Sequence, residues 1–377
     1  MALSSRTPQT GAGMSMRGQV DIHWRTGELE GFAQFNLLPG ITALIGPSGA
    51  GKTTLARLIT GLEAPKGGTI TLDGQRLFDS RENIDVRTDK RMIALVPQDS
   101  ALFPHMSVYE NLSFGCRIDE DLLMGLCERA GIRNLLDARV HEISGGEARR
   151  AAIIRAIASA PRLLILDEPM NGLDPKRRRE MMALIRGLSD TTGQMVLMIT
   201  HQAEEMLTVA DNAILMDGLR ATVHGPLQQV FARPETSELL DLDDAGELII
   251  ATISDRQDGM IGCALGGQTL WLPDDGEDIG TKVRLRVLAR DVAIAKQRIE
   301  GISVINQIEC CLVHINKRRR GTDLMLVPNG TDLHLSSRIT ARSLTALGLK
   351  EGDTVYALIK AVAVKELVAT PKSASGS

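Results

Sequence analysis

Hydrophobic residues in the first two thirds of the chain form short continuous runs, with helical patterns between them. The runs cover residues 41–45, 92–96, 162–166 and 195–199. Because they do not alternate with polar residues, they are typical of parallel strands that are buried on both faces of a sheet. Helical patterns at 149–158 and 176–188 fall between the runs. This alternation predicts an α/β domain with a mostly parallel sheet.

The pattern changes after about residue 241, where the runs become short, β-branched and bounded by Gly, Asp and Asn. They cover residues 248–254, 269–272, 283–287, 308–315 and 324–327. These are strand signals, and their succession predicts a small all-β barrel of the oligonucleotide/oligosaccharide-binding type. We therefore expect an α/β domain at 19–235 and a barrel domain at 245–377, with the boundary between 230 and 245.

Composition and charge narrow the class of protein. Hydrophobic residues make up 43 % and charged residues 24 %, and the net charge is -4, so no global basic field favours a nucleic-acid partner.

No apolar run approaches the roughly 18 to 20 residues that span a bilayer, so any membrane role requires partner subunits. Residues 1–18 lack the apolar core of a secretory signal and are predicted to form a disordered tail. The five cysteines show no C-x-x-C spacing and are predicted to be free thiols.

A glycine-rich motif follows the run at 41–45. It matches G-x-x-x-x-G-K-[ST] and consists of Gly46, Pro47, Ser48, Gly49, Ala50, Gly51, Lys52, Thr53 and Thr54. Between a strand and a helix, such a loop directs backbone N–H groups at phosphate oxygens, and the helix dipole adds to the attraction. We expect Lys52 to contact the β- and γ-phosphates of ATP and Thr53 to hold Mg²⁺.

Two carboxylates follow the run at 162–166. Asp167 is placed to bind Mg²⁺, directly or through water. Glu168 is placed to polarise the attacking water as a general base. A strand that ends in Asp-Glu is common, and the phosphate loop upstream gives this one its chemical meaning.

Ser144-Gly145-Gly146-Glu147 precedes the helical pattern at 149–158. Ser-x-x-Glu is a capping box, and a capped helix start with two bare glycines is also an exposed anion site. Here the chain resembles the ABC-type ATPases, whose signature is Leu-Ser-Gly-Gly-Gln, with Ile143 and Glu147 as departures.

The resemblance implies roles for further residues. Gln98 matches the Q-loop glutamine, which reaches Mg²⁺ and the attacking water. Asp174, in Asn171-Gly172-Leu173-Asp174, matches the D-loop, and His201 matches the switch histidine that contacts the γ-phosphate. Trp24 stands where an aromatic ring often stacks on adenine.

The family also implies partners and a location. Its nucleotide lies between the phosphate loop of one chain and the signature of a second, so we expect a homodimer. A membrane permease would contact residues 99–112, which places the chain at the cytoplasmic face of the inner membrane. An oxyanion-binding protein outside the membrane would deliver the cargo to the permease.

The C-terminal region resembles the molybdate-binding repeat called Mop, a TOBE-type domain, over about 303–364. Matching stretches are Ser303-Val304-Ile305-Asn306, Ile339-Thr340, Leu347-Gly348-Leu349 and Ile359-Lys360-Ala361. The resemblance implies molybdate import and an oxyanion site formed by Ser303, Asn306, Ser337, Thr340, Ser343 and Lys360. Ile305 stands where family members often carry Arg, so we expect this site to bind molybdate or tungstate weakly.

Other readings of the same residues lead to other functions. The barrel could serve only to dimerise the subunit. The chain could power a sulfate, iron or polyamine importer, although the Ile339-Thr340-x-x-Ser343 and Gly348-to-Lys360 pattern argues against these cargoes. A soluble repair or translation ATPase would carry two cassettes or long coiled coils, and a soluble molybdate store would lack the ATPase motifs.

Overall fold

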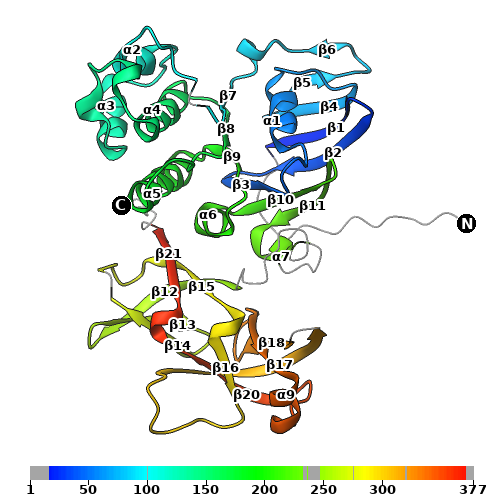
Figure 1. The fold of residues 1–377 in the computed structure, drawn as a ribbon, viewed down its shortest axis with the longest axis vertical. Coiled ribbons are helices and arrows are strands. Elements are labelled where there is room, and N and C mark those ends of the chain that lie inside the picture. Colours follow the sequence, from blue (N-terminus) through cyan, green and yellow to red (C-terminus); the bar gives the residue numbers. More distant parts are fainter. Residues whose placement is uncertain are drawn as a thin grey trace, which may run out of the picture.

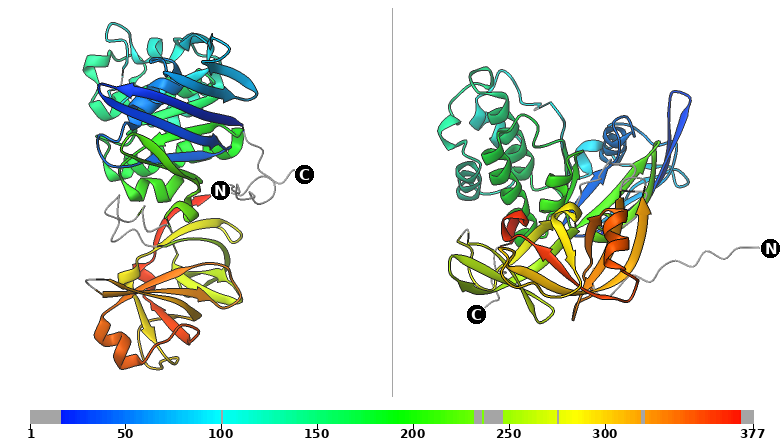
Figure 2. Two further views of the ribbon diagram at one scale, coloured as in Figure 1. Left: turned by 90° about the vertical axis from the view of Figure 1, so that its right-hand side faces the viewer. Right: turned by 60° about the horizontal axis from the view of Figure 1, so that its bottom comes forward.

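The computed structural model describes residues 17–99, 101–231, 236, 247–274, 276–318 and 321–370. The chain forms an upper α/β lobe and a lower β lobe (Figures 1 and 2). Nearly all of the predicted tail at 1–18, and most of the predicted boundary at 230–245, lie outside the described residues. Within the described part, no helix is both long and apolar enough to cross a membrane.

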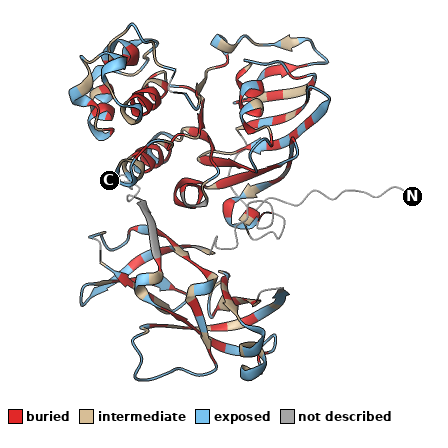
Figure 3. Ribbon diagram, viewed as in Figure 1, coloured by how far each residue is buried: buried red, intermediate tan, exposed pale blue. Residues whose placement is uncertain are grey.

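The α/β lobe is built on an 11-stranded sheet in the order β6-β5-β4-β1-β2-β11-β10-β3-β9-β8-β7. Four neighbouring strands are parallel: β3 (Ile41–Ile45), β9 (Met195–Ile199), β8 (Leu163–Asp167) and β7 (Ile93–Val96). A fifth parallel strand, β10 (Asn212–Asp217), pairs with the other edge of β3. The four predicted strands are confirmed. β7 starts one residue later than predicted because Met92 has a φ of 56°, outside the extended region. Burial on both faces colours β3, β8 and β9 red in Figure 3, whereas most of β7 at the edge of the sheet is only half-buried.

The rest of this sheet is antiparallel except for the parallel pairing of β11 with β2, and it was not predicted. It comprises β1 (Gly18–Thr26), β2 (Leu29–Leu37), β4 (Gly67–Leu72), β5 (Gln75–Asp79), β6 (Ile84–Asp85) and β11 (Arg220–Pro226). Buried and exposed residues alternate along β1 and β2, because one face of each strand is exposed.

Helices surround the parallel strands. They are α1 (Lys52–Thr60), α2 (Val108–Ser113), α3 (Glu120–Arg129), α4 (Gly145–Ala158), α5 (Pro175–Thr192), α6 (Ala203–Val209) and α7 (Leu227–Phe231). The helices predicted at 149–158 and 176–188 are confirmed as α4 and α5. α4 is longer than predicted because the cap at Ser144 starts it earlier, whereas α5 starts one residue earlier at the Asp174 cap and continues to Thr192. Figure 1 shows α2, α3 and α4 gathered in a subdomain apart from α1.

The β lobe contains two five-stranded sheets. The first has the order β14-β13-β12-β15-β21 and the second β16-β20-β17-β18-β19. The strands are β12 (Glu247–Gln257), β13 (Met260–Leu265), β14 (Gln268–Pro273), β15 (Lys282–Val287), β16 (Val292–Ala295), β17 (Asn306–Arg318), β18 (Gly321–Pro328), β19 (Leu335–Ile339), β20 (Thr354–Ile359) and β21 (Lys365–Thr370), with helix α9 at Ala341–Leu347. A single hydrophobic core lies between the sheets, so they form one barrel-like unit.

Candidate functional site

The glycine-rich loop joins the end of β3 to the start of α1, as the sequence predicts. Gly46 has a φ of 154°, and a Cβ at this position would lie 2.1 Å from the carbonyl oxygen of Met216, so only glycine fits. The buried Lys52 ammonium donates to the carbonyl oxygens of Gly46 and Pro47, each at 2.8 Å. Burial lowers the pKa of Lys52, while the nearby carboxylates Glu168 and Asp167 act in the opposite direction.

Thr53 and Asp167 meet beside this loop. The Thr53 hydroxyl, in the first turn of α1, donates to Oδ2 of Asp167 at 2.8 Å. Asp167 is 4 % exposed at the end of β8, and burial raises its pKa against the effect of the Thr53 hydrogen bond. A hydroxyl and a carboxylate oxygen next to a phosphate loop are the hard ligands that Mg²⁺ requires. The donor set at this point therefore fits that ion.

Glu168 is held in a strained and well-defined position. Its φ of 48° is unusual for a residue other than glycine, and its N–H donates to the carbonyl of Ile199 at 2.9 Å. Nδ1 of His201 lies 3.1 Å from Glu168 Oε1, and the amide of Asn171 donates to Oε2. The neighbouring strands β8 and β9 thus bring Glu168 and His201 together, and Asn171 orients the carboxylate.

The signature residues form an exposed helix start. Ser144 caps α4, and its N–H and hydroxyl both donate to Oε2 of Glu147 at 2.8 Å. The backbone hydrogen bond from Ser144 is the main cause of the lowered pKa of Glu147. Ser144 and Gly145 are exposed. The signature therefore lies exposed at the start of α4, in the subdomain that α4 forms with α2 and α3.

The D-loop packs against this signature and starts α5. A Cβ on Gly146 would lie 3.2 Å from the carbonyl oxygen of Gly172, so the two loops are in close contact. Asp174 caps α5 by accepting from the N–H groups of Lys176 and Arg177, both at 3.0 Å. The bond from Arg177 is the main cause of the lowered pKa of Asp174.

The segment that contains Gln98 is attached to α4, a contact that the sequence did not predict. Arg149 is 4 % exposed, and its guanidinium donates to the carbonyl oxygens of Pro97 and Gln98. Further along α4, Arg155 lies over the ring of Phe103 at 5.1 Å. The side chain of Gln98 is exposed, whereas its backbone is tied to the signature helix.

The structure does not support stacking of adenine on Trp24. The side chain is 3 % exposed and belongs to the core that also contains Leu55 of α1. A Cβ on Gly31 would lie 2.2 Å from the indole, so the ring packs directly on that glycine. The Trp24 prediction is therefore corrected, since a ring buried in this way is a core residue.

Part of the predicted oxyanion set lies at one end of the barrel. Asn306 and Val292 both pair with Ile359, the residue before Lys360, from opposite sides of β20. The Ser337 hydroxyl donates to the carbonyl of Val292 at 2.6 Å. The start of β16, the start of β17, the end of β20 and the middle of β19 therefore bring these positions close together.

Two members of this set are already engaged. Asn306 is 1 % exposed, accepts from the N–H of Trp271 at 2.7 Å and donates to the Trp271 carbonyl at 2.9 Å. Ser337 is fully buried and donates within the barrel. The prediction that these two side chains hold an oxyanion is therefore corrected: their polar groups stabilise the barrel.

The other four members remain accessible. Ser303, Thr340 and Lys360 are exposed, and Ser343 is half-buried. Thr340 caps α9 by accepting from the N–H of Ser343 at 3.0 Å, and the two hydroxyl oxygens are 2.8 Å apart. Ile305 is 54 % exposed beside Ser303.

Comparisons with known proteins agree with this organisation. Residues 34–171 match the family model described as ABC transporter, and residues 319–365 match the TOBE domain. The chain is 36 % identical over 353 residues to the molybdenum import ATP-binding protein ModC of Paramagnetospirillum magneticum, covering 92 % of this chain and 97 % of that protein. It is 39 % identical to ModC of Methylococcus capsulatus, over 87 % and 93 % of the two chains.

A solved structure matches part of the chain. It is cbiO1 from Clostridium perfringens, part of the ABC transporter complex cbiONQ, with a TM-score of 0.50 and 29 % identity over 60 % of this chain and 95 % of that one. The relatives match nearly the whole chain, including both lobes. The chain therefore belongs to the family of ABC transporter ATP-binding subunits that contains the molybdenum import ATP-binding proteins.

Proposed function

We propose that this chain is the ATP-hydrolysing subunit of a molybdate importer. The observation that carries the ATPase part is the convergence of Lys52, Thr53, Asp167, Glu168 and His201 at the ends of adjacent parallel strands. This arrangement provides a cation for phosphate, oxygen ligands for Mg²⁺ and a carboxylate for water. The relatives' names supply the cargo.

The residues present define the hydrolytic step. Water attacks the γ-phosphorus, the bond between this phosphorus and the bridging oxygen to the β-phosphate breaks, and ADP leaves. Glu168 accepts the proton of the attacking water as general base. Asn171 and His201 hold the Glu168 carboxylate, so the base does not have to reorient at the moment of reaction. Lys52 stabilises the charge on the transferring phosphoryl group.

Mg²⁺ fits the point where Thr53 and Asp167 meet. When bound there, it would neutralise charge on the β- and γ-phosphate oxygens. Gln98 is the remaining candidate ligand, and its exposed side chain is consistent with a contact that forms when nucleotide enters. Asp167 is already desolvated, which strengthens its interaction with a cation.

A homodimer follows from the position of the signature. Ser144 and Gly145 are exposed on a subdomain separate from α1, so the nucleotide on one chain can be covered by the signature of a second. The free N–H groups at the start of α4 then point at an anion. The D-loop lies against the same signature through Gly146 and would be part of the same interface.

The permease surface is proposed at residues 99–112. A cavity of about 250 Å³ beside it is lined by Phe103, Phe114 and Arg155, among others. Phe114 is 57 % exposed, and an exposed aromatic ring next to a hollow is suited to an inserted helix of a partner. This surface would hold the chain at the cytoplasmic face of the membrane.

An uptake experiment tests the cargo. The chain and a candidate permease are expressed in cells that lack their own molybdate importer, and uptake of labelled molybdate and sulfate is measured. We expect ATP-dependent molybdate uptake that is lost in Glu168→Gln. Uptake of sulfate but not molybdate would contradict the cargo assignment and leave the ATPase assignment intact.

A further inference from the structure

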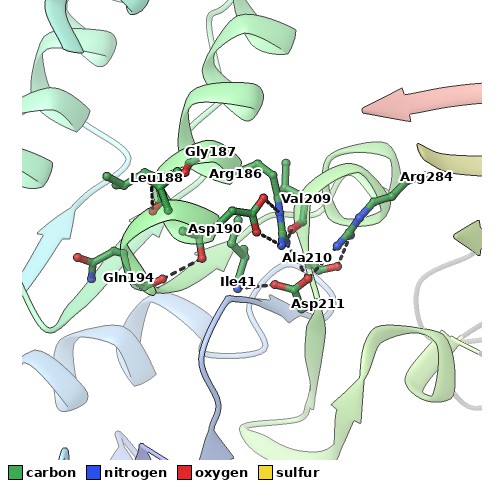
Figure 4. Close-up of polar contacts among 12 residues, drawn as sticks. Ile41, Arg186, Gly187, Leu188, Asp190, Gln194, Val209, Ala210, Asp211 and Arg284 are labelled. Atoms are coloured by element: carbon green, nitrogen blue, oxygen red, sulfur yellow. Dashed lines mark hydrogen bonds and ion pairs between the residues drawn. The ribbon is translucent and has the colours of Figure 1, made fainter. Parts of the chain in front are cut away.

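The carboxylate of Asp211 joins both lobes of the molecule (Figure 4). Asp211 lies between α6 and β10. Its Oδ1 accepts from Nη1 of Arg186 on α5 at 2.7 Å and from Nη2 of Arg284 on β15 at 2.8 Å. Its Oδ2 accepts from the backbone N–H of Ile41 at the start of β3 at 3.0 Å. One side chain thus contacts a helix and a strand of the ATPase lobe and a strand of the barrel.

Arg284 is the contribution of the barrel to this junction. Its side chain is 7 % exposed, and its Nη1 donates to the carbonyl oxygen of Ala210 at 2.6 Å. The guanidinium therefore binds two oxygens of consecutive residues in the other lobe, in the forked geometry for which arginine is suited. The buried cation would be costly without these partners.

The charges at the junction balance. Arg186 also forms an ion pair with Asp190 one turn further along α5, with Nε at 2.9 Å from Oδ2. Two guanidinium groups therefore face two carboxylates, Asp190 and Asp211. Removing the charge of Arg284 leaves the cluster with one excess negative charge in a partly buried position. The remaining groups must then rearrange or take up solvent.

Two elements of the nucleotide site contact this cluster. β3 leads from Ile41 directly into the phosphate loop. Asp211 binds both backbone groups of Ile41, because its own N–H also donates to the Ile41 carbonyl at 2.7 Å. The fit is close: a Cβ on Gly40 would lie 2.4 Å from Oδ2 of Asp211. α5, which carries Arg186, starts at the D-loop residue Asp174.

We propose that Arg284 is a positioning residue for ATP hydrolysis, which acts through Asp211 on the base of the phosphate-loop strand and on the D-loop helix. The barrel is then a working part of the ATPase and not only an appended domain. This inference rests on the proposed ATPase function. In this proposal, a structural change in the barrel is transmitted to the nucleotide site through the contact between the two lobes.

The test uses the full-length chain with Arg284→Gln. We expect kcat for ATP hydrolysis to fall about three- to tenfold, as for loss of one member of a coupled network, with KM for ATP unchanged. Hydrogen exchange read by peptide should accelerate at β3 and at the part of α5 around Arg186, where the junction contacts these elements. Arg284→Lys keeps the charge but not the fork, and should recover part of the rate.

A double-mutant cycle shows whether the effect passes through Asp211. Asp211→Asn alone should lower kcat at least as much as Arg284→Gln. Adding Arg284→Gln to Asp211→Asn should then change little, because the shared interaction has already gone. Independent, additive losses would overturn the proposed route.

Arg256→Gln is the matched control. Arg256 pairs with Asp274 at 2.9 Å inside the barrel, so its loss perturbs the barrel without touching the junction. We expect a wild-type kcat and faster exchange in the barrel alone. The proposal is overturned if Arg284→Gln behaves like this control. If the wild-type chain hydrolyses no ATP, the proposed function fails, and the exchange pattern at β3 and α5 still decides whether the junction acts there.

Discussion

The two lobes use their polar residues in different ways. In the ATPase lobe, the predicted site residues contact one another: Thr53 donates to Asp167, and His201 lies against Glu168. In the barrel, Asn306 and Ser337 are engaged with the backbone of their own domain. A ligand-binding motif that depends on backbone geometry and fixed spacing is therefore easier to recognise than a scattered set of donors on strands.

The central strands could be predicted from the sequence because burial on both faces leaves continuous apolar runs, and the phosphate loop could be predicted because its glycines and lysine have a fixed spacing. The alternating strands β1 and β2 leave a weaker pattern. Trp24 was therefore predicted to stack on adenine, although it lies on the buried face of β1. The contact of Arg284 with Asp211 could not be predicted. It joins residues 73 positions apart, and neither belongs to a recognisable motif.

The largest expected effect concerns the ATPase lobe. Glu168→Gln should slow hydrolysis by roughly 10²- to 10⁴-fold, the usual contribution of a general base, while ATP still binds. The amide keeps the shape of the side chain but cannot accept the proton. Single-turnover hydrolysis measures the rate, and ATP-bound dimer should accumulate on a sizing column. An unchanged rate would show that another group is the base.

The next prediction concerns ATP binding by the phosphate loop. Lys52→Ala removes the main side-chain partner of the phosphates and should weaken ATP binding by roughly a hundredfold. Equilibrium binding of a fluorescent ATP analogue measures this. Lys66 lies outside the loop, and Lys66→Ala serves as the control, with wild-type affinity expected. Near-normal affinity of Lys52→Ala would contradict the phosphate-loop assignment.

In the barrel, the accessible part of the oxyanion set can be strengthened. Ile305→Arg places a guanidinium beside Ser303, and a charge-assisted contact of this kind should tighten molybdate binding by roughly ten- to a hundredfold. Calorimetry on the full-length chain compares molybdate, tungstate and sulfate. No binding at millimolar concentration, before or after the substitution, would favour the reading of the barrel as a dimerisation module.

The smallest effect separates structural donors from ligands within the barrel. Asn306→Ala leaves the backbone N–H and carbonyl of Trp271 without their partner, and should lower the free energy of unfolding by about 1–3 kcal/mol. The exposed Ser303→Ala should change it by less than about 0.5 kcal/mol. Denaturant unfolding measures both. Equal stability of the two variants would contradict the structural role given to Asn306.

The central claim is that two chains share each nucleotide, and activity of mixed variants tests it most directly. Ser144→Arg and Lys52→Ala chains are each assayed for ATP hydrolysis alone and then mixed. We expect Ser144→Arg to bind ATP and hydrolyse none, because the bulky cation blocks the partner's γ-phosphate. The mixture should recover partial activity, since one of its two composite sites has both an intact phosphate loop and an intact signature. Wild-type hydrolysis by Ser144→Arg alone would contradict the account, because the signature would then play no part in the site.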